Sequence, residues 1–278
     1  MFREGAGVSS ENAPFTVDAT TPHPARRYDY WLGGKDNFQV DRDAADAIEK
    51  QFPTVRLLAQ ENRWFLHRSV RFAARELGIR QFLDIGTGIP TSPNTHQVAQ
   101  EIDPAARIVY VDNDPLVLAH ARALLTGTPQ GRTAYIDADL REPDKILHHA
   151  DTAAALDFTE PVALMMLAVL HFIKDEENPR AIVDTFVDAL PDGSLVVVSH
   201  GTAEHVTAEQ AARIGRADAS QARVRSGVEL AALFARPDLH LVEPVTSISR
   251  WWAEAAPQPR PSVADVAMNG LVARVVRR

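Results

Sequence analysis

The sequence feature that most constrains this chain is an apolar run that ends in two closely spaced glycines, Phe82-Leu-Asp84-Ile-Gly86-Thr-Gly88. Bulky apolar residues before the glycines predict the end of a buried strand. The glycines allow the chain to turn and a ligand to approach the backbone. A helix is predicted to follow from Pro93 to about Glu101, with Ser92 as its N-cap. Together these elements predict the nucleotide-binding corner of an open α/β sheet.

An acidic residue follows the next predicted strand. Residues 107–111 form a β-branched run that leads into Asp112-Asn113-Asp114-Pro115. A carboxylate at the end of this strand can accept hydrogen bonds from both hydroxyls of a ribose, which is the role expected for Asp112. Asp114 is expected instead to cap the helix that Pro115 opens.

The third predicted strand indicates which nucleoside is bound. Residues 133–136 lead into Asp137-Ala-Asp139-Leu140, where Asp139 could accept a hydrogen bond from an adenine amino group and Leu140 could offer its backbone N–H. A dinucleotide site would require a third glycine, at the position that Thr91 occupies. The pattern therefore favours an adenosine without phosphates, as in S-adenosylmethionine (SAM).

These segments are similar to motifs of the class I SAM-dependent methyltransferases. Four further segments resemble an actinobacterial family of SAM methyltransferases with no assigned substrate: residues 24–38 (Pro24 to Phe38), 62–66 (Asn62-Arg63-Trp-Phe-Leu), 95–99 (Thr95-His96-Gln-Val-Ala) and 169–172 (Val169-Leu-His171-Phe). The resemblance covers roughly residues 24–276. It implies a Rossmann-like α/β fold with SAM as the cofactor, and it implies no particular substrate.

The motifs and the resemblance together predict a set of cofactor-binding residues. Arg63 belongs to a predicted helix, residues 54–77, on which a basic residue recurs every four positions; the stripe is expected to face solvent, except that Arg63 is expected to pair with the carboxylate of SAM. The predicted set is Tyr28, Gly33, Arg63, Asp84, Gly86, Thr87, Gly88, Asp112, Asn113, Asp139, Leu140 and Ala168.

The N-terminal part of the chain is expected to form an extension. Residues 1–19 show no periodicity and are predicted to lack regular structure. Residues 28–35 combine aromatic rings with Gly33-Gly34. The family resemblance implies that this segment forms a lid over SAM, with Tyr28 close to the ligand. The alternative is that the rings only anchor an N-terminal helix. The predicted division is 1–55 for the extension and lid, and 56–278 for the methyltransferase domain.

Methyl transfer from a sulfonium mainly requires alignment, and it requires a general base only if the acceptor loses a proton. His171 and His200 follow the fourth and fifth predicted strands, residues 162–167 and 195–199. Each is a candidate catalytic base or, equally, a structural histidine. His96 could contact the ligand or serve the backbone. No spacing of histidines and carboxylates predicts a metal site.

The C-terminal third completes the predicted sheet. Two capping boxes, Thr207-x-x-Gln210 and Ser226-x-x-Glu229, predict helix starts. Residues 239–243 and 266–276 are the last predicted strands, and Gly270 within the second predicts a bulge or close backbone contact. The count is about seven strands, mostly parallel, with helices on both faces.

Composition limits the possible partners. With 29 Lys and Arg against 37 Asp and Glu, the net charge of −8 argues against a nucleic-acid partner. Cysteine is absent, and no apolar run reaches the roughly 20 residues of a membrane span. We expect a cytoplasmic enzyme that acts on a small molecule. The sequence does not predict its oligomeric state. One alternative is a non-catalytic SAM-binding regulator. The other is a nicotinamide-dependent oxidoreductase, which the missing third glycine disfavours.

Overall fold

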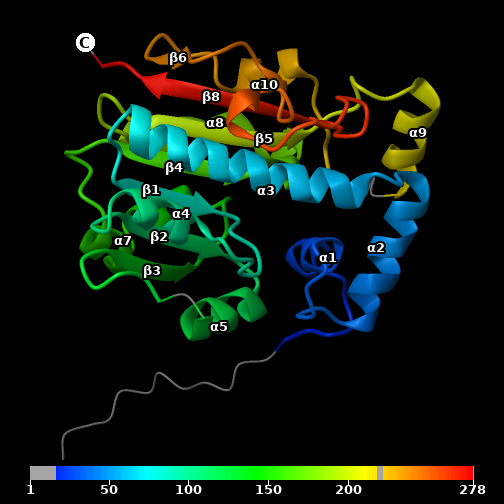
Figure 1. Cartoon of the computed structure of the whole chain (residues 1–278), viewed down its shortest axis with the longest axis horizontal. Coiled ribbons are helices and arrows are strands. Elements are labelled where there is room, and N and C mark those ends of the chain that lie inside the picture. Colours follow the sequence, from blue (N-terminus) through cyan, green and yellow to red (C-terminus); the bar gives the residue numbers. More distant parts are fainter. Residues whose placement is uncertain (1–16, 125, 218–221, 278) are drawn as a thin grey trace, which may run out of the picture.

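The computed structural model describes residues 17–124, 126–217 and 222–277. One mixed sheet runs through the molecule in the order β3-β2-β1-β4-β5-β8-β6, and β7 pairs with β8 (Figure 1). Its strands are β1 (Gln81–Ile85), β2 (Arg107–Asp112), β3 (Arg132–Asp137), β4 (Val162–Leu167), β5 (Leu195–Gly201), β6 (Leu239–Leu241), β7 (Thr246–Ser247) and β8 (Met268–Val275).

The predicted Rossmann-like fold is confirmed. The strands β3, β2, β1, β4 and β5 are parallel, whereas β8 runs antiparallel to β5. The sheet has eight strands rather than seven. The additional strand, β7, has two residues, which is too short to leave a periodic pattern in the sequence.

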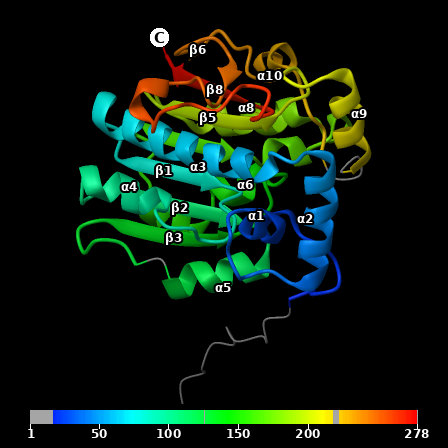
Figure 2. The ribbon, with the colours of Figure 1, turned by 45° about the vertical axis from the view of Figure 1, so that its right-hand side comes forward.

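The helices cover both faces of the sheet. Helices α3, α4 and α5 pack on one face, and α6, α7, α8 and α10 pack on the other; Figure 2 shows α3 lying along the sheet. The bounds are α1 (Pro24–Trp31), α2 (Gln39–Gln51), α3 (Val55–Arg71) with a π-helical turn (Phe72–Glu76), α4 (Thr95–Ile102), α5 (Pro115–Leu124), α6 (Pro143–Leu147), α7 (Ala150–Ala155), α8 (Pro179–Ala189), α9 (Ala208–Ala217) and α10 (Gly227–Leu233).

Local signals in the sequence placed several elements correctly. The strand β4 has the predicted bounds, and both capping boxes form, with Thr207 N donating to Gln210 Oε1 over 2.9 Å and Ser226 N donating to Glu229 Oε2 over 2.7 Å. Gly270 is a position of close contact, since a Cβ there would lie 3.0 Å from the Phe65 ring.

Helix α4 begins later than predicted. Asn94, not Ser92, is its N-cap, and Asn94 N donates to Gln97 Oε1 over 2.7 Å. The carbonyl of Pro93 accepts from Arg63 and lies 2.9 Å from His67 Nε2, and both of these residues belong to α3. The segment before Asn94 therefore contacts α3 and does not form the first turn of α4. The sequence predicted that His67 belongs to a basic stripe that faces solvent. This prediction is wrong for His67, because its side chain is buried.

The N-terminal helices stand at the carboxyl ends of the parallel strands (Figures 1 and 2). Arg26 on α1 pairs with Asp114 after β2 at 2.9 Å and with Asp41 on α2 at 3.6 Å, and all three side chains are buried. Asp114 also accepts the N–H of Leu116 at 2.9 Å, so its predicted role as a helix cap is confirmed. In the part of the chain that the structure describes, every helix is too short or too polar to span a bilayer.

Candidate active site

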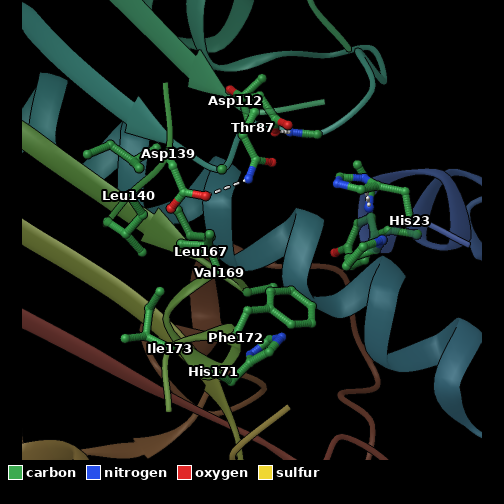
Figure 3. Close-up of a pocket in the computed structure, with 18 of the residues that line it drawn as sticks. His23, Thr87, Asp112, Asp139, Leu140, Leu167, Val169, His171, Phe172 and Ile173 are labelled. Carbon is green, nitrogen blue, oxygen red and sulfur yellow. Dashed lines mark hydrogen bonds between the residues drawn. The ribbon is translucent and has the colours of Figure 1, made fainter. Parts of the chain in front are cut away.

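A pocket of about 700 Å³ opens at the carboxyl ends of β1, β2, β3 and β4, beneath α1 and beside α3. Ligand pockets commonly measure 300–1,000 Å³. It lies where the strand order reverses between β1 and β4, which is the binding crevice of open α/β sheets. In Figure 3, Thr87, Asp112 and Asp139 lie on one side of this pocket, and His171 and Phe172 lie on the other.

The glycine turn shapes the floor of the pocket. Gly86 and Gly88 have φ values of +70° and +68°, which favour glycine. A Cβ on Gly86 would lie 2.4 Å from Val169 Cγ2, so any other residue would collide with the segment after β4. Thr87 lies between them and lines the pocket. Ala168, also in the lining, has φ +54°, a backbone strain typical of binding sites.

Asp112 is held by the backbone in a geometry that suits a diol. Its Oδ2 accepts the N–H of Gly88 at 2.8 Å, and its Oδ1 accepts the N–H of Asp114 at 2.9 Å. A carboxylate can accept about four hydrogen bonds, so each oxygen retains one acceptor position. Burial raises the pKa of Asp112 above its ordinary value. The side chain can therefore receive two hydroxyl groups without rearranging.

Asp139 is more heavily engaged than the sequence suggested. Its Oδ2 accepts from Asn113 Nδ2 at 2.8 Å, and its Oδ1 accepts from the backbone N–H of Arg141 at 2.8 Å. The Arg141 guanidinium contacts both oxygens at 3.1 and 3.2 Å. Asn113, Asp139 and Leu140 all line the pocket. A contact between Asp139 and an adenine amino group has to displace one of these donors.

Asp84 and Arg63 bring opposite charges to the same part of the pocket. Asp84 accepts from Thr95 Oγ1 at 2.6 Å, and burial raises the pKa of its carboxyl to about 6. Arg63 donates to the carbonyls of Thr91 and Pro93. A carboxylate and a guanidinium side by side complement the ammonium and carboxylate of an amino acid.

Helix α1 forms part of the pocket wall. Tyr28 lines it, donates to the carbonyl of Ala59 at 3.0 Å and accepts from Asn62 Nδ2 at 3.0 Å. Gly33, in contrast, does not line the pocket. It follows the C-terminus of α1 with φ +83°, the conformation that glycine supplies where a helix ends. The structure therefore separates Gly33 from the other predicted cofactor-binding residues.

The two candidate catalytic histidines have different environments. His171 lines the pocket. His200 is fully buried outside the lining, where its Nδ1 contacts the carbonyl of Gly201 at 2.8 Å and its Nε2 contacts Arg225 NH1 at 3.1 Å. Both ring nitrogens of His200 are occupied, so the structure does not support a catalytic base at this position.

His96 has a structural role, because it is buried outside the pocket and its Nδ1 lies 2.9 Å from the Tyr110 hydroxyl.

Several residues that line the pocket were not predicted from the sequence: Trp31, Asn62, Arg141, Val169 and Phe172. All five lie within or beside the recognised motifs, and Arg141 directly follows Asp139-Leu140. Within the described ranges, no three histidine, aspartate or glutamate side chains form a cluster that could hold a metal ion.

A family model described as S-adenosyl methyltransferase matches residues 10–276 of this chain. The chain belongs to the S-adenosyl methyltransferase family. It is a SAM-dependent methyltransferase with SAM as its cofactor, and the vacant acceptor positions of Asp112 and the charges of Asp84 and Arg63 fit that ligand. The resemblance seen in the sequence is thereby confirmed.

Two solved structures support the family assignment over nearly the whole length. A DUF574 family protein from Streptomyces avermitilis is 42% identical, with a TM-score of 0.87 over 94% of this chain and 100% of that chain. A candidate methyltransferase from Thermobifida fusca is 39% identical, with a TM-score of 0.84 over 94% and 97%. No curated protein matches the chain.

Proposed function

We propose that this methyltransferase acts in the cytoplasm on a small-molecule acceptor that binds between α1 and the segment after β4. The observation that carries the proposal is the position of α1, whose Tyr28 and Trp31 line the same pocket of about 700 Å³ as His171. A pocket of this size, shared between SAM and the acceptor, suits a small molecule. The net charge of −8 does not favour a nucleic-acid acceptor.

The cofactor is expected to lie along the ends of β1, β2 and β3. Asp112 receives the ribose hydroxyls. Asn113, Asp139 and Leu140 surround the adenine, while Arg63 and Asp84 hold the carboxylate and ammonium of the methionine part. The turn from Gly86 to Gly88 allows close approach of the ligand to the backbone.

When bound, SAM supplies a methyl group that its sulfonium already activates. The protein's contribution is to align the acceptor and to exclude water. Leu167, Ala168 and Val169 form part of the wall beside the glycine turn, and α1 covers the outside. This arrangement requires no metal ligand from the chain.

Transfer of a labelled methyl group tests the proposal. The protein is incubated with methyl-labelled SAM and a cell extract that has been separated into small-molecule, protein and nucleic-acid fractions. Label is expected in the small-molecule fraction. Label confined to protein or nucleic acid would show that the acceptor is a macromolecule.

A further inference from the structure

The side of the pocket that faces away from the cofactor residues differs from the cofactor side in charge. The carboxylates Asp84, Asp112 and Asp139 lie at the ends of β1 to β3, on the cofactor side. His171 and Phe172 lie on the opposite side (Figure 3), and the pocket lining outside the cofactor residues also includes Arg27, the aromatic and apolar side chains of Trp31, Leu58, Leu66 and Met268, and the charged side chains of Lys174, Glu176 and Glu177. Arg27 is buried, and its charge acts on the His171 ring.

His200 cannot accept a proton from the acceptor. Arg225 NH1 must donate in its 3.1 Å contact with His200 Nε2, because a guanidinium has no acceptor. The lone pair of Nε2 is therefore used, and the proton of the ring lies on Nδ1, which donates to the carbonyl of Gly201. Arg225 itself is fixed by Asp175 at 2.6 Å and by the carbonyl of Ile173 at 2.9 Å.

The environment of His171 determines which of its nitrogens carries the proton. Its Nδ1 is buried without a hydrogen-bond partner, close to the backbone of Gly201. A buried N–H without an acceptor is rarer and more costly than an unfilled lone pair, so the proton lies on Nε2. Burial, the neighbouring His200 and the charges of Arg27 and Arg225 lower the pKa of His171 to about 3, and the ring stays neutral.

It follows that His171 presents an N–H donor to the pocket rather than a lone pair. Its ring lies in the pocket wall next to the Phe172 ring (Figure 3), with the Nδ1 edge turned toward Gly201. The backbone is fixed as well, since Arg223 N donates to the carbonyl of His171 at 2.7 Å. An N–H donor near a cation is suited to bind an anionic oxygen.

The other ionisable side chains on this side are engaged or lie at the rim. Tyr28 donates its hydroxyl proton to the carbonyl of Ala59. Glu177 binds Arg141 at 2.6 Å, and Glu176 and Lys174 are exposed. Within the described residues, none of these groups stands next to His171 as a free base.

We propose that the methyl acceptor is an anionic oxygen, a carboxylate or the phenolate of an acidic phenol, carried on an apolar or aromatic body and bound by the Nε2–H of His171. The proposal rests on the proposed function. The oxygen uses a lone pair to form a bond to the methyl carbon, the carbon–sulfur bond breaks, and its electron pair stays on sulfur. The products are a methyl ester or ether and S-adenosylhomocysteine. No proton is transferred, so no general base is required.

The tautomer of His171 can be measured directly by ¹⁵N NMR of the histidine-labelled protein with S-adenosylhomocysteine bound. The expected result is a neutral ring with the proton on Nε2 from about pH 5 to pH 9, assigned by loss of the signals in His171→Gln. A ring that carries its proton on Nδ1, or one that becomes protonated in this range, would overturn the proposal.

Binding of three compounds with one skeleton tests the acceptor class. Benzoate, benzyl alcohol and benzylamine are titrated by calorimetry into the complex with S-adenosylhomocysteine. Benzoate is expected to bind at least about tenfold more tightly than the other two, because only it offers a charged acceptor. The proposal is wrong if benzoate binds no better than the alcohol or amine, or if none of the three binds.

Two substitutions connect this preference to His171. His171→Phe retains a ring but removes the donor, so the preference for benzoate should be lost. His171→Gln retains an N–H donor and should keep the preference, and an unchanged preference in His171→Phe would count against the proposal. Affinity for S-adenosylhomocysteine is measured in each variant as a control. If the unsubstituted protein itself does not bind S-adenosylhomocysteine, the result contradicts the proposed function.

Discussion

At the scale of single residues, Asp112 shows how the backbone can prepare a side chain for a ligand. The N–H groups of Gly88 and Asp114 each bind one of its oxygens and fix the plane of the carboxylate. The remaining acceptor positions point away from these donors, where a ribose is expected. Asp137 provides a natural comparison, because it is the register partner of Asp112 on β3 but is exposed and lies outside the pocket.

Replacing Asp112 by Ala should lower the affinity for S-adenosylhomocysteine at least about tenfold, since each hydrogen bond to a charged acceptor contributes about 1.5–3 kcal/mol. The melting temperature should also fall, because the two backbone N–H groups lose their acceptor. Isothermal titration calorimetry gives the affinity. The matched variant Asp137→Ala should bind normally; equal affinities in the two variants would place the ribose elsewhere.

Asp84 should make cofactor binding depend on pH. Burial raises the pKa of its carboxyl from 3.8 to about 6, so a growing fraction is neutral as the pH falls below about 6 and cannot pair with an ammonium. Affinity for S-adenosylhomocysteine should therefore decrease between about pH 7 and pH 5 in calorimetric titrations. In Asp84→Asn the affinity should be low and nearly independent of pH in this range, and a pH profile unchanged by the substitution would exclude Asp84 as the partner.

The same shift has the opposite sign for the stability of the ligand-free protein. The folded state binds more protons than the unfolded state between about pH 4 and pH 6, because the folded pKa is the higher one. This carboxyl therefore contributes stability at low pH that is lost as the pH rises through about 6. Asp84→Asn should remove that contribution, which thermal unfolding at several pH values would detect.

At the scale of elements, α1 joins the segment after β2, on the cofactor side of the pocket, to helix α2. Arg26 pairs with Asp114, two residues after the ribose-binding candidate, and with Asp41 on α2. The aromatic residues of α1 are also anchored: Tyr28 contacts Ala59 and Asn62, and Tyr30 donates to Asp46 at 3.1 Å. These contacts favour the anchoring alternative for the rings, while the lid itself remains a prediction.

Weakening this anchor tests the lid. In Arg26→Gln the amides of residues 23–35 should exchange faster with solvent, and affinity for S-adenosylhomocysteine should fall, because a looser α1 covers the pocket less well. Hydrogen exchange with mass spectrometry and calorimetry give the two readouts. Arg42→Gln, on the neighbouring helix α2, is the control. If exchange of this segment is equally slow with and without ligand in the unsubstituted protein, α1 is a fixed wall and not a lid.

At the scale of the whole molecule, the binding site joins segments that are distant in the sequence, from His23 to Met268. A ligand that binds only the folded protein stabilises it by RT ln(1 + [L]/Kd), which is about 2.7 kcal/mol at a hundredfold excess over Kd. S-adenosylhomocysteine should therefore raise the melting temperature in a differential scanning experiment. NADH at the same concentration should not, and a shift with NADH alone would favour the oxidoreductase alternative.

The sequence by itself determined the features that depend on neighbouring residues. The glycine turn at Gly86, the carboxylate at Asp112 and the capping boxes of α9 and α10 each follow from a few consecutive side chains. Parallel strands place their carboxyl ends at one edge. Polar residues after β1, β2 and β3 could therefore be expected to meet before any contact was known.

Only the tertiary structure decided between the possible roles of a residue. His171 follows β4 and His200 lies within β5, and both were equal candidates by sequence, yet Arg225 occupies the lone pair of His200 and only His171 lines the pocket. In the same way, His67 was expected in a stripe that faces solvent, but it is buried and its Nε2 contacts the carbonyl of Pro93, 26 residues away in the sequence. These outcomes depend on pairings between side chains that folding brings together, and no local pattern encodes such a pairing.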